Sequence, residues 1–200
     1  MKKQVFQLKT KPDGIYRLDS FLSENFICIG YPRLNDLSNT NKDMIRDMLT
    51  EHYSFSGGLL RVHLSTVNTF VNTMNPGDFV LVKEGDFINV GKIGEYFFDP
   101  KYVSEGMCHR RNVVWIAKFK KKDLRSDVLS LINNMNTISR LKDIIDNEYD
   151  LLENKPNINP DIEIKDDLII KSIKVLNDAL NSSCEEIRVK AACSLLNYFK

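Results

Sequence analysis

Three consecutive residues, His109-Arg110-Arg111, carry side chains that suit phosphate groups and flat aromatic ligands. Histidine and arginine donate charged hydrogen bonds to phosphate oxygens, and a guanidinium plane also stacks on a nucleobase. A strand is expected to follow, and its alternation would point one of Arg110 and Arg111 inward and the other outward. The inward arginine has the alternative of pairing with a carboxylate such as Asp78. We expect at least one of the three cationic residues to contact phosphate.

Four further side chains are suited to hold a base or its sugar. Tyr31 and Tyr96 offer ring faces for stacking, and Tyr31 directly follows a short apolar run. Asp36 and Ser38 lie in the same polar loop as Tyr31 and can hydrogen-bond the edge of a base or a sugar. Two alternatives stay open. Tyr31 can be an ordinary loop aromatic, and Asp36 and Ser38 can cap the helix expected after Asn39.

Sequence patterns for catalysis and for metal binding are absent. The four cysteines are scattered and include no C-x-x-C pair, which argues against a disulfide framework and against a zinc site. Cys108 and His109 are neighbours in sequence and do not make a nucleophile–base pair through local geometry. There is no G-x-S-x-G, H-E-x-x-H or P-loop motif. We expect a binding protein that is not an enzyme, with no catalytic residues, metal ligands or cofactor.

The overall charge is nearly balanced, with a formal net charge of +1 over 200 residues. Any contact with a polyanion must therefore come from a local patch, such as the lysines between 118 and 122. No apolar run approaches the roughly 18 residues that span a bilayer, and the N-terminus lacks the apolar segment of a signal peptide. We expect a cytoplasmic protein with no membrane partner.

The segment 75–122 has the densest β-forming composition of the chain and is expected to position most of these residues. Glycines at 91 and 94 indicate bulges or bends within it. Its last strand alternates and should place Val113, Trp115, Ala117 and Phe119 on one side. Strands are expected at 4–8, 26–30, 79–82, 87–93 and 112–119. The second of these is almost wholly apolar and is predicted to be a buried central strand.

Helical periodicity and capping residues predict helices that flank the sheet. The helices are expected from Thr40, at 60–74, from Asp123 and from Thr137. Together these elements predict an α+β domain over 1–152 with a small, curved or barrel-like sheet. Asn and Pro residues make 153–165 a linker, and 166–200 reads as a helical hairpin. A hairpin of this size buries too little apolar area to be stable alone, so it must dock on something.

The order of these motifs resembles the EVE-like branch of the PUA superfamily, in the form found at the N-terminus of modification-dependent restriction endonucleases. The matching pieces are Ile29-Gly30-Tyr31-Pro32, Asp36-Leu37-Ser38, Met74-Asn75-Pro76-Gly77-Asp78-Phe79-Val80, Gly91-Lys92-Ile93-Gly94-Glu95-Tyr96 and His109-Arg110-Arg111-Asn112-Val113-Val114-Trp115. The resemblance covers roughly 26–141 and includes the helices expected from Asp123 and Thr137. It departs from the family where Tyr31 replaces a tryptophan found in many relatives, and no nuclease-type carboxylate cluster follows Leu152.

The resemblance implies a PUA/EVE-like fold that binds nucleic acid and accommodates one modified base in an aromatic-lined pocket. The expected function is therefore a reader of a modified base, in DNA rather than RNA, in a restriction, defence or phage setting. RNA binding stays open, as does a protein-interaction adaptor that uses 166–200 to hold a partner or a second copy. The reader interpretation requires that the loop 30–39 and the segment 75–122 meet in space.

Overall fold

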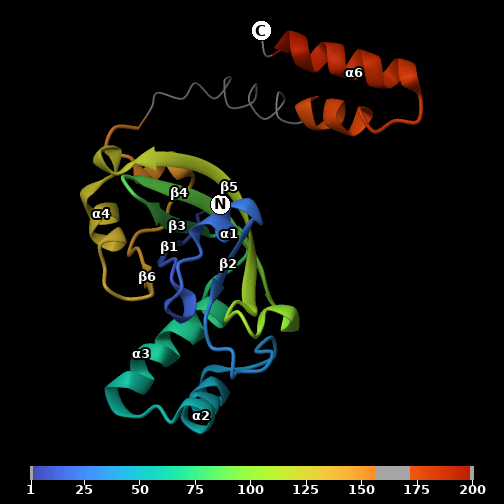
Figure 1. The fold of residues 1–200 in the computed structure, drawn as a ribbon. Coiled ribbons are helices and arrows are strands. Elements are labelled where there is room, and N and C mark those ends of the chain that lie inside the picture. The colour runs from blue at the N-terminus through green and yellow to red at the C-terminus, as the bar shows by residue number, and fades with distance from the viewer. Residues whose placement is uncertain (1, 156–171, 199–200) are drawn as a thin grey trace. The chain divides into compact units, whose positions relative to one another are not determined.

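The chain forms two compact units in the computed structural model, Met1–Asn154 and Lys155–Lys200. The structure describes residues 2–155 and 172–198 (Figure 1). In the second unit, residues 172–179 are helical and a further helix, α6, spans Glu185–Tyr198. Most of the expected linker at 153–165, and the first residues of the hairpin expected at 166–200, lie outside the described residues.

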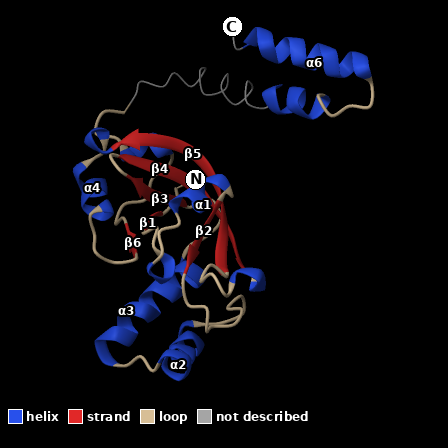
Figure 2. Ribbon diagram, viewed as in Figure 1, coloured by secondary structure: helices blue, strands red, loops and turns tan. Residues whose placement is uncertain are grey.

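The first unit is built on a six-stranded mixed sheet with the strand order β2-β5-β4-β3-β1-β6 (Figure 2). The strands are β1 Val5–Leu8, β2 Phe26–Ile29, β3 Phe79–Glu84, β4 Phe87–Phe98, β5 His109–Lys120 and β6 Ile138–Arg140. β1 and β3 run parallel, and the other neighbours are antiparallel. The α+β class with flanking helices is confirmed. The sheet is open rather than barrel-like, because the short strands β2 and β6 end it without pairing to each other.

Successive residues of a strand point to opposite faces of the sheet, and helices pack on both of these faces. The helices are α1 Leu18–Ser23, α2 Lys42–Tyr53, α3 Gly57–Asn68 and α4 Ser126–Ile132, and a π-helical turn at Thr69–Thr73 extends α3. On β3, Val80 packs in the core that α1, α2 and α3 share, while Leu81 packs in the core that contains α4. Most side chains of β1, β2 and β3 are therefore buried, whereas β4 and β5 also carry exposed ones.

β2 was expected to be a central strand, and this prediction is wrong because β2 ends the sheet. All four of its residues are nevertheless buried. Phe21 of α1 packs edge-on against Phe26 at 5.3 Å between ring centroids, and Leu34 and Leu37 of the following loop join the same core. An apolar run indicates that a strand is buried, but it does not indicate a central position in the sheet. The outer side of β2 is covered by α1 and a loop instead of by a second neighbouring strand.

The helix expected from Thr137 is also wrong, because Ile138–Arg140 forms β6 and pairs with β1. Apolar residues at 138, 141 and 145 suit a helical face. Ile138, however, packs in the core of α1–α3, whereas Leu141 and Ile145 pack in the core of α4. An extended segment can reach both faces of the sheet, and it also pairs the main-chain groups that β1 would otherwise expose.

The long β4–β5 pair contains two register shifts, one at Gly91 and one around Gly94, as the glycines predict. At the first shift Ile116 is an extra residue on β5. An extra residue turns the side chains that follow to the other face. Trp115 thus packs on the core of α1–α3 and Phe119 on the core of α4, so the expected single-sided alternation is wrong beyond Trp115.

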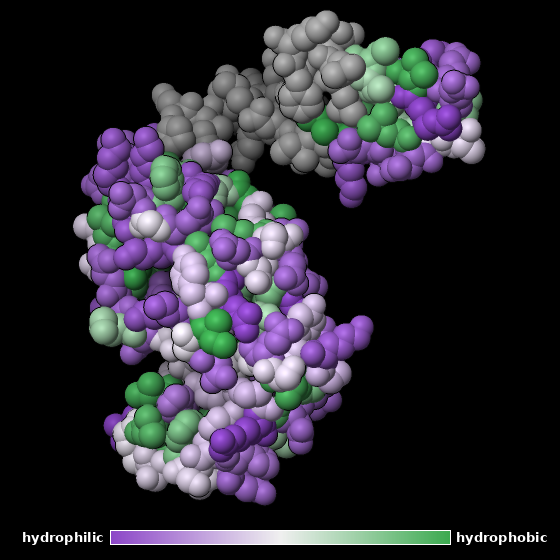
Figure 3. Space-filling model, viewed as in Figure 1, coloured by the Kyte–Doolittle hydropathy of each residue, from purple (hydrophilic) through white to green (hydrophobic). Residues whose placement is uncertain are grey.

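None of the helices within 2–155 and 172–198 has the length and apolar character needed to cross a membrane. On the face of the first unit that Figure 3 shows, hydrophilic residues surround scattered hydrophobic ones. Most of the large apolar side chains of the first unit are buried between the sheet and its helices.

Candidate functional site

The loop 30–39 meets the sheet through hydrogen bonds around His109, which begins β5 and is fully buried. Nε2 of His109 lies 3.2 Å from the main-chain oxygen of Tyr31, and Nδ1 lies 2.8 Å from the hydroxyl of Tyr96. That hydroxyl accepts a hydrogen bond from the N–H of Leu37 at 3.2 Å. A neutral imidazole protonated on Nε2 satisfies both contacts. Three of the residues predicted to form the site therefore converge, and they fasten the loop to the sheet.

Tyr31 is held in a backbone conformation that non-glycine residues rarely adopt, with φ at 84°. Its hydroxyl lies 2.7 Å from Nδ1 of His63 on α3, and its ring makes edge contacts with His63 and Tyr53. Burial raises the pKa of Tyr31 above its usual range. Tyr31 thus joins α3 to His109, and this bonding compensates a conformation that costs about 1–3 kcal/mol.

His109 gives the protein a predicted acid sensitivity, because burial lowers its pKa to about 4. The unfolded chain, with a histidine pKa of about 6.5, takes up the proton first as the pH falls. The contribution of neutral His109 to the free energy of unfolding is therefore fully present above pH 6.5 and is lost as the pH falls from 6.5 to about 4. From pH 7 to pH 5 we expect the free energy of unfolding to fall by about 2 kcal/mol more than in His109→Gln. Urea unfolding at both pH values measures this, and an NMR titration of His109 near pH 6.5 would contradict it.

Arg110 is enclosed by aromatic rings and carboxylates. Its guanidinium carbon lies 3.5 Å from the ring centroid of Phe26 and 4.3 Å from that of Tyr102. Carboxylate oxygens of Glu24 and Asp99 lie 3.4 Å and 3.9 Å from its terminal nitrogens. Two aromatic rings lie against the guanidinium and two carboxylates compensate its charge, so Arg110 stabilises the edge of the sheet in this structure.

Arg111 is buried on the opposite face, where it binds main-chain oxygens at the end of the α3 segment. Its guanidinium donates to the carbonyls of Phe70, Val71, Met74 and Gly94 at 2.7–3.0 Å. Helix ends leave such carbonyls without partners, and Arg111 satisfies them. Burial lowers its pKa to about 10, so it remains charged at neutral pH. The expectation that one of the two arginines points outward is wrong, because both faces of the sheet are covered here.

Asp36 and Ser38 form a local turn on the exposed side of the loop. Oδ1 of Asp36 accepts hydrogen bonds from the N–H and the hydroxyl of Ser38 at 3.0 and 2.6 Å. Neither residue caps α2. Asn41 does so by accepting from the N–H groups of Asp43 and Met44. Thr40 was expected to start this helix and lies just before the cap. Asp36 and Ser38 remain exposed beside the hydrogen-bonded group of Tyr31, Tyr96 and His109.

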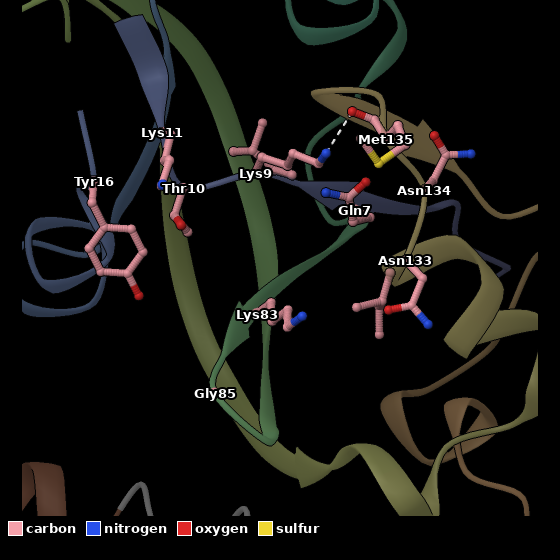
Figure 4. Close-up of a pocket in the computed structure, with 12 residues that line it drawn as sticks. Gln7, Lys9, Thr10, Lys11, Tyr16, Lys83, Gly85, Asn133, Asn134 and Met135 are labelled. Atoms are coloured by element: carbon pink, nitrogen blue, oxygen red, sulfur yellow. Dashed lines mark hydrogen bonds between the residues drawn. The ribbon is translucent and has the colours of Figure 1, made fainter. Parts of the chain in front are cut away.

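Sequence reasoning missed a cavity of about 390 Å³ on the first unit. Figure 4 shows Tyr16 at one end and residues 133–135 at the other, with Gln7, Lys9 and Lys83 between them. The residues that line it are Gln7, Leu8, Lys9, Thr10, Lys11, Tyr16, Lys83, Gly85, Ile132, Asn133, Asn134 and Met135. They come from β1, the segment after it, the β3–β4 turn and the end of α4.

Gln7 is the unusual residue of this cavity, because its polar side chain is only 4% exposed. Its Oε1 atom is buried and has no hydrogen-bond partner among the described residues. A buried acceptor in that state costs about 1–3 kcal/mol, and a donor on a ligand can recover this. The sequence contained one indication, since Gln7 is the polar member of a four-residue strand that is otherwise apolar and buried throughout.

The cavity has a cationic lining. Lys9, Lys11 and Lys83 border it, and no aspartate or glutamate does so among the residues described. Lys9 donates to the main-chain oxygen of Met135 at 2.6 Å (Figure 4). The charge of Lys121 lowers the pKa of Lys83, and Asp86, which lies 3.7 Å from the amine of Lys121, partly offsets this effect. An anion bound near Lys83 would relieve the repulsion between the two lysines.

Within 2–155 and 172–198, no three His, Cys, Asp or Glu side chains are grouped so as to hold a metal ion. The chemistry that the cavity offers is hydrogen bonding to an amide, contact with an aromatic ring and attraction of negative charge. These are the properties of a site for a polar, anionic ligand with a flat part.

Comparison with known proteins adds one finding. A family model described as a domain of unknown function (DUF8426) matches residues 9–142, about two thirds of the chain. The matched part contains Tyr31, Tyr96 and His109, and it begins at Lys9, just after Gln7. No curated protein and no solved structure matches the chain significantly.

Proposed function

The chain belongs to the DUF8426 family of domains, and we propose that it is a nucleic-acid-binding protein that holds one extruded base in the cavity beside Gln7. The observation that carries this proposal is the buried Oε1 of Gln7, which lacks a partner among the described residues and borders a cavity rimmed by three lysines. The proposal is one of binding without catalysis. It shifts the base-holding role from the residues around His109 to residues near the N-terminus.

The dimensions and chemistry of the cavity support a nucleotide as ligand. A volume of about 390 Å³ falls within the usual range for small-molecule sites. The amide of Gln7 suits the edge of a base that carries an exocyclic amine, as in adenine or cytosine. Tyr16 is 53% exposed and offers a ring face on which a base can stack. Lys11 and Lys83 suit the adjoining phosphates.

The recognition of a modified base, and of DNA before RNA, follows from the proposed kinship with EVE-like PUA domains. An open mixed sheet flanked by helices is compatible with such a kinship. The bonds of Tyr31, Tyr96 and His109 fix the loop 30–39, and Asp36 and Ser38 stay exposed on it to contact a sugar or base. A restriction, defence or phage setting belongs to the same proposal.

Gln7→Leu tests the function directly. The substitution keeps the volume of the side chain and removes its amide, so we expect affinity for a short single-stranded oligonucleotide to fall about tenfold, the loss of one hydrogen bond of roughly 1.4 kcal/mol. Gln4→Leu is the matched control, because Gln4 lies three residues earlier and does not line the cavity. Fluorescence anisotropy at two salt concentrations measures the affinity.

The same titration compares DNA and RNA that carry unmodified or methylated cytosine and adenine. Gln7→Leu should not lower the free energy of unfolding, because it removes a buried acceptor that lacks a partner among the described residues. A loss of binding then reports on the site and not on the fold. Negligible binding to every oligonucleotide, or equal binding by the parent and Gln7→Leu, would contradict the proposal.

A second function, as a protein-interaction adaptor, is favoured by exposed apolar residues in the helical C-terminal unit. Val175, Ile187 and Val189 are 67%, 47% and 55% exposed within it. Pairing of the two helices as the hairpin expected at 166–200 belongs to this alternative, as does contact with a second copy. Removing 161–200 separates the two functions: nucleic-acid binding should survive, while self-association, measured by light scattering, should be lost.

A further inference from the structure

The cavity beside Gln7 is one of five cavities whose linings overlap, and four of them lead in a row toward α2 and α3. Asn134 borders it and a second cavity of about 480 Å³. Ser65 and Asn136 border that second cavity and a third of about 190 Å³. Arg61 and Ser65 border the third and a fourth of about 410 Å³ between α2 and α3. Shared lining residues connect these four cavities in a row on the first unit, and we call the row the basic groove.

The side chains that line the basic groove have one sign of charge. Its cationic residues are Lys9, Lys11, Lys83, Arg140, Arg61, Lys42 and Arg46. Within the described part of the chain, no aspartate or glutamate lines these four cavities. The fifth cavity, which shares Asn134, Ser139 and Arg140 with the basic groove, is bordered by Asp127 and Asp143. The whole sequence has 28 basic and 27 acidic residues, so the seven cations of the basic groove are concentrated along it, and two aspartates lie at the adjoining fifth cavity.

Three of these cations are free to bind an anion. Lys42, Arg61 and Arg140 are exposed, and their side chains make no ion pair or hydrogen bond with any of the described residues. Arg46 is paired with the exposed Asp43. Focused positive potential of this kind attracts polyanions, and it does so even when the net charge of the protein is near zero.

The middle of the basic groove supplies neutral polar groups. The hydroxyls of Ser65, Thr69 and Thr73 follow one another along α3 and its π-helical extension, opposite the amide of Asn136. Hydroxyl and amide groups form most of the non-ionic contacts that proteins make to phosphate and sugar. The third cavity, at about 190 Å³, is the smallest of the four.

We propose that the basic groove binds the backbone of a single nucleic-acid strand, from the base held beside Gln7 to the α2–α3 pair. This inference rests on the proposed function for the base and extends it to the nucleotides on one side of that base. Four adjoining cavities correspond to roughly four nucleotides, the lower end of the range for single-strand sites. Backbone contact through lysine and arginine makes the affinity dependent on strand length and salt.

The test uses the full-length chain, single-stranded DNA of two, four, eight and twelve nucleotides, and the double variant Lys42→Glu/Arg61→Glu. We expect the affinity of the parent to rise up to about four to eight nucleotides and then to level off. The double variant should bind the eight-nucleotide strand at least tenfold more weakly. Its slope of log affinity against log salt should be shallower by about 1.4, for two phosphate contacts. Binding of the two-nucleotide strand should be unchanged.

Lys101→Glu/Lys122→Glu is the matched control, since both lysines are exposed and neither borders the basic groove. Lys42→Gln/Arg61→Gln repeats the test without charge reversal, and thermal unfolding checks that each variant is folded. If two nucleotides bind as well as eight, or if the control weakens binding as much as the double variant, the groove is overturned and the base site stands. Tighter binding of duplex DNA or of a polyglutamate peptide also overturns the groove. Failure of every strand to bind overturns the base site and the groove together.

Discussion

Replacing Arg111 with methionine is expected to lower the free energy of unfolding by about 3–5 kcal/mol. Methionine fills much of the same volume but supplies none of the four hydrogen bonds that Arg111 donates to Phe70, Val71, Met74 and Gly94. Each carbonyl left buried without a donor costs about 1–3 kcal/mol, and local relaxation keeps the total below the sum. Urea unfolding followed by the fluorescence of Trp115, the single tryptophan, measures the loss.

Two further variants test whether the loss of stability comes from the hydrogen bonds of the buried Arg111. Arg61→Met removes an arginine that is exposed and should change stability by no more than about 0.5 kcal/mol. Arg111→Lys keeps the charge but concentrates the donors at one point, whereas the four acceptors are spread around the planar fork of the guanidinium. Most of the loss should therefore remain in Arg111→Lys. A loss under 1 kcal/mol in Arg111→Met would mean that these carbonyls find other partners.

Arg110 and Arg111 are both buried, so their residue type alone did not indicate their structural role. Strand alternation does place Arg110 and Arg111 on opposite faces of β5, as the sequence predicts. What the sequence does not reveal is that Arg110 meets Glu24 at the end of α1, while Arg111 meets the carbonyls at the end of the α3 segment. Three of the four partners of Arg111 are about 40 positions away in the sequence, and those of Arg110 include Glu24, 86 positions away. Local patterns carry no information at that distance.

Sequence patterns predicted correctly those strands and helices that depend on residues close together in the chain. Strands β3, β4 and β5, their bulges near Gly91 and Gly94, and the buried stripe of α3 all follow from alternation, glycine and helical spacing. The segment at 138–145 fails for a different reason. Its apolar spacing suits a helix, and the free edge of β1, over 120 residues upstream, selects a strand instead.

The candidate site also has a part that the sequence interpretation named and a part that it missed. The sequence interpretation required the loop 30–39 to meet the segment 75–122, and Tyr31, Tyr96 and His109 do meet, through hydrogen bonds to one another. The cavity beside Gln7 was not predicted, since its lining comes from four segments. The parallel pairing of β1 with β3 brings Gln7 near Lys83, and periodicity within either strand does not predict which strands pair.

Gly91→Ala is expected to lower the free energy of unfolding by about 3 kcal/mol, at the upper end of what overpacking usually costs. Gly91 lies opposite Trp115 at the first register shift of the β4–β5 pair. A Cβ atom at this position would lie 2.2 Å from Cγ1 of Val113 and 2.9 Å from Cε3 of Trp115. Carbon atoms in contact prefer about 3.5–4.0 Å, so one neighbour or the backbone must move.

Neither neighbour can move cheaply, and this is what sets the size of the effect. Val113 is buried and β-branched, which restricts its rotation. The indole of Trp115 donates a hydrogen bond to the main-chain oxygen of Phe21 at 3.1 Å, so a shift of the ring breaks its link to α1. Gly58→Ala is the matched control, because no atom lies within 4 Å of a Cβ there, and it should not lower stability.

A double-mutant cycle with Val113→Ala identifies the clash as the cause. Val113→Ala alone should destabilise the protein by removing buried methyl groups. Together with Gly91→Ala it also removes the 2.2 Å contact, so the pair should be more stable than the sum of the single losses by about 1–2 kcal/mol. Strict additivity would mean that the β4–β5 pair yields through its backbone, and that Gly91 serves the bend of the strand rather than the room for Val113.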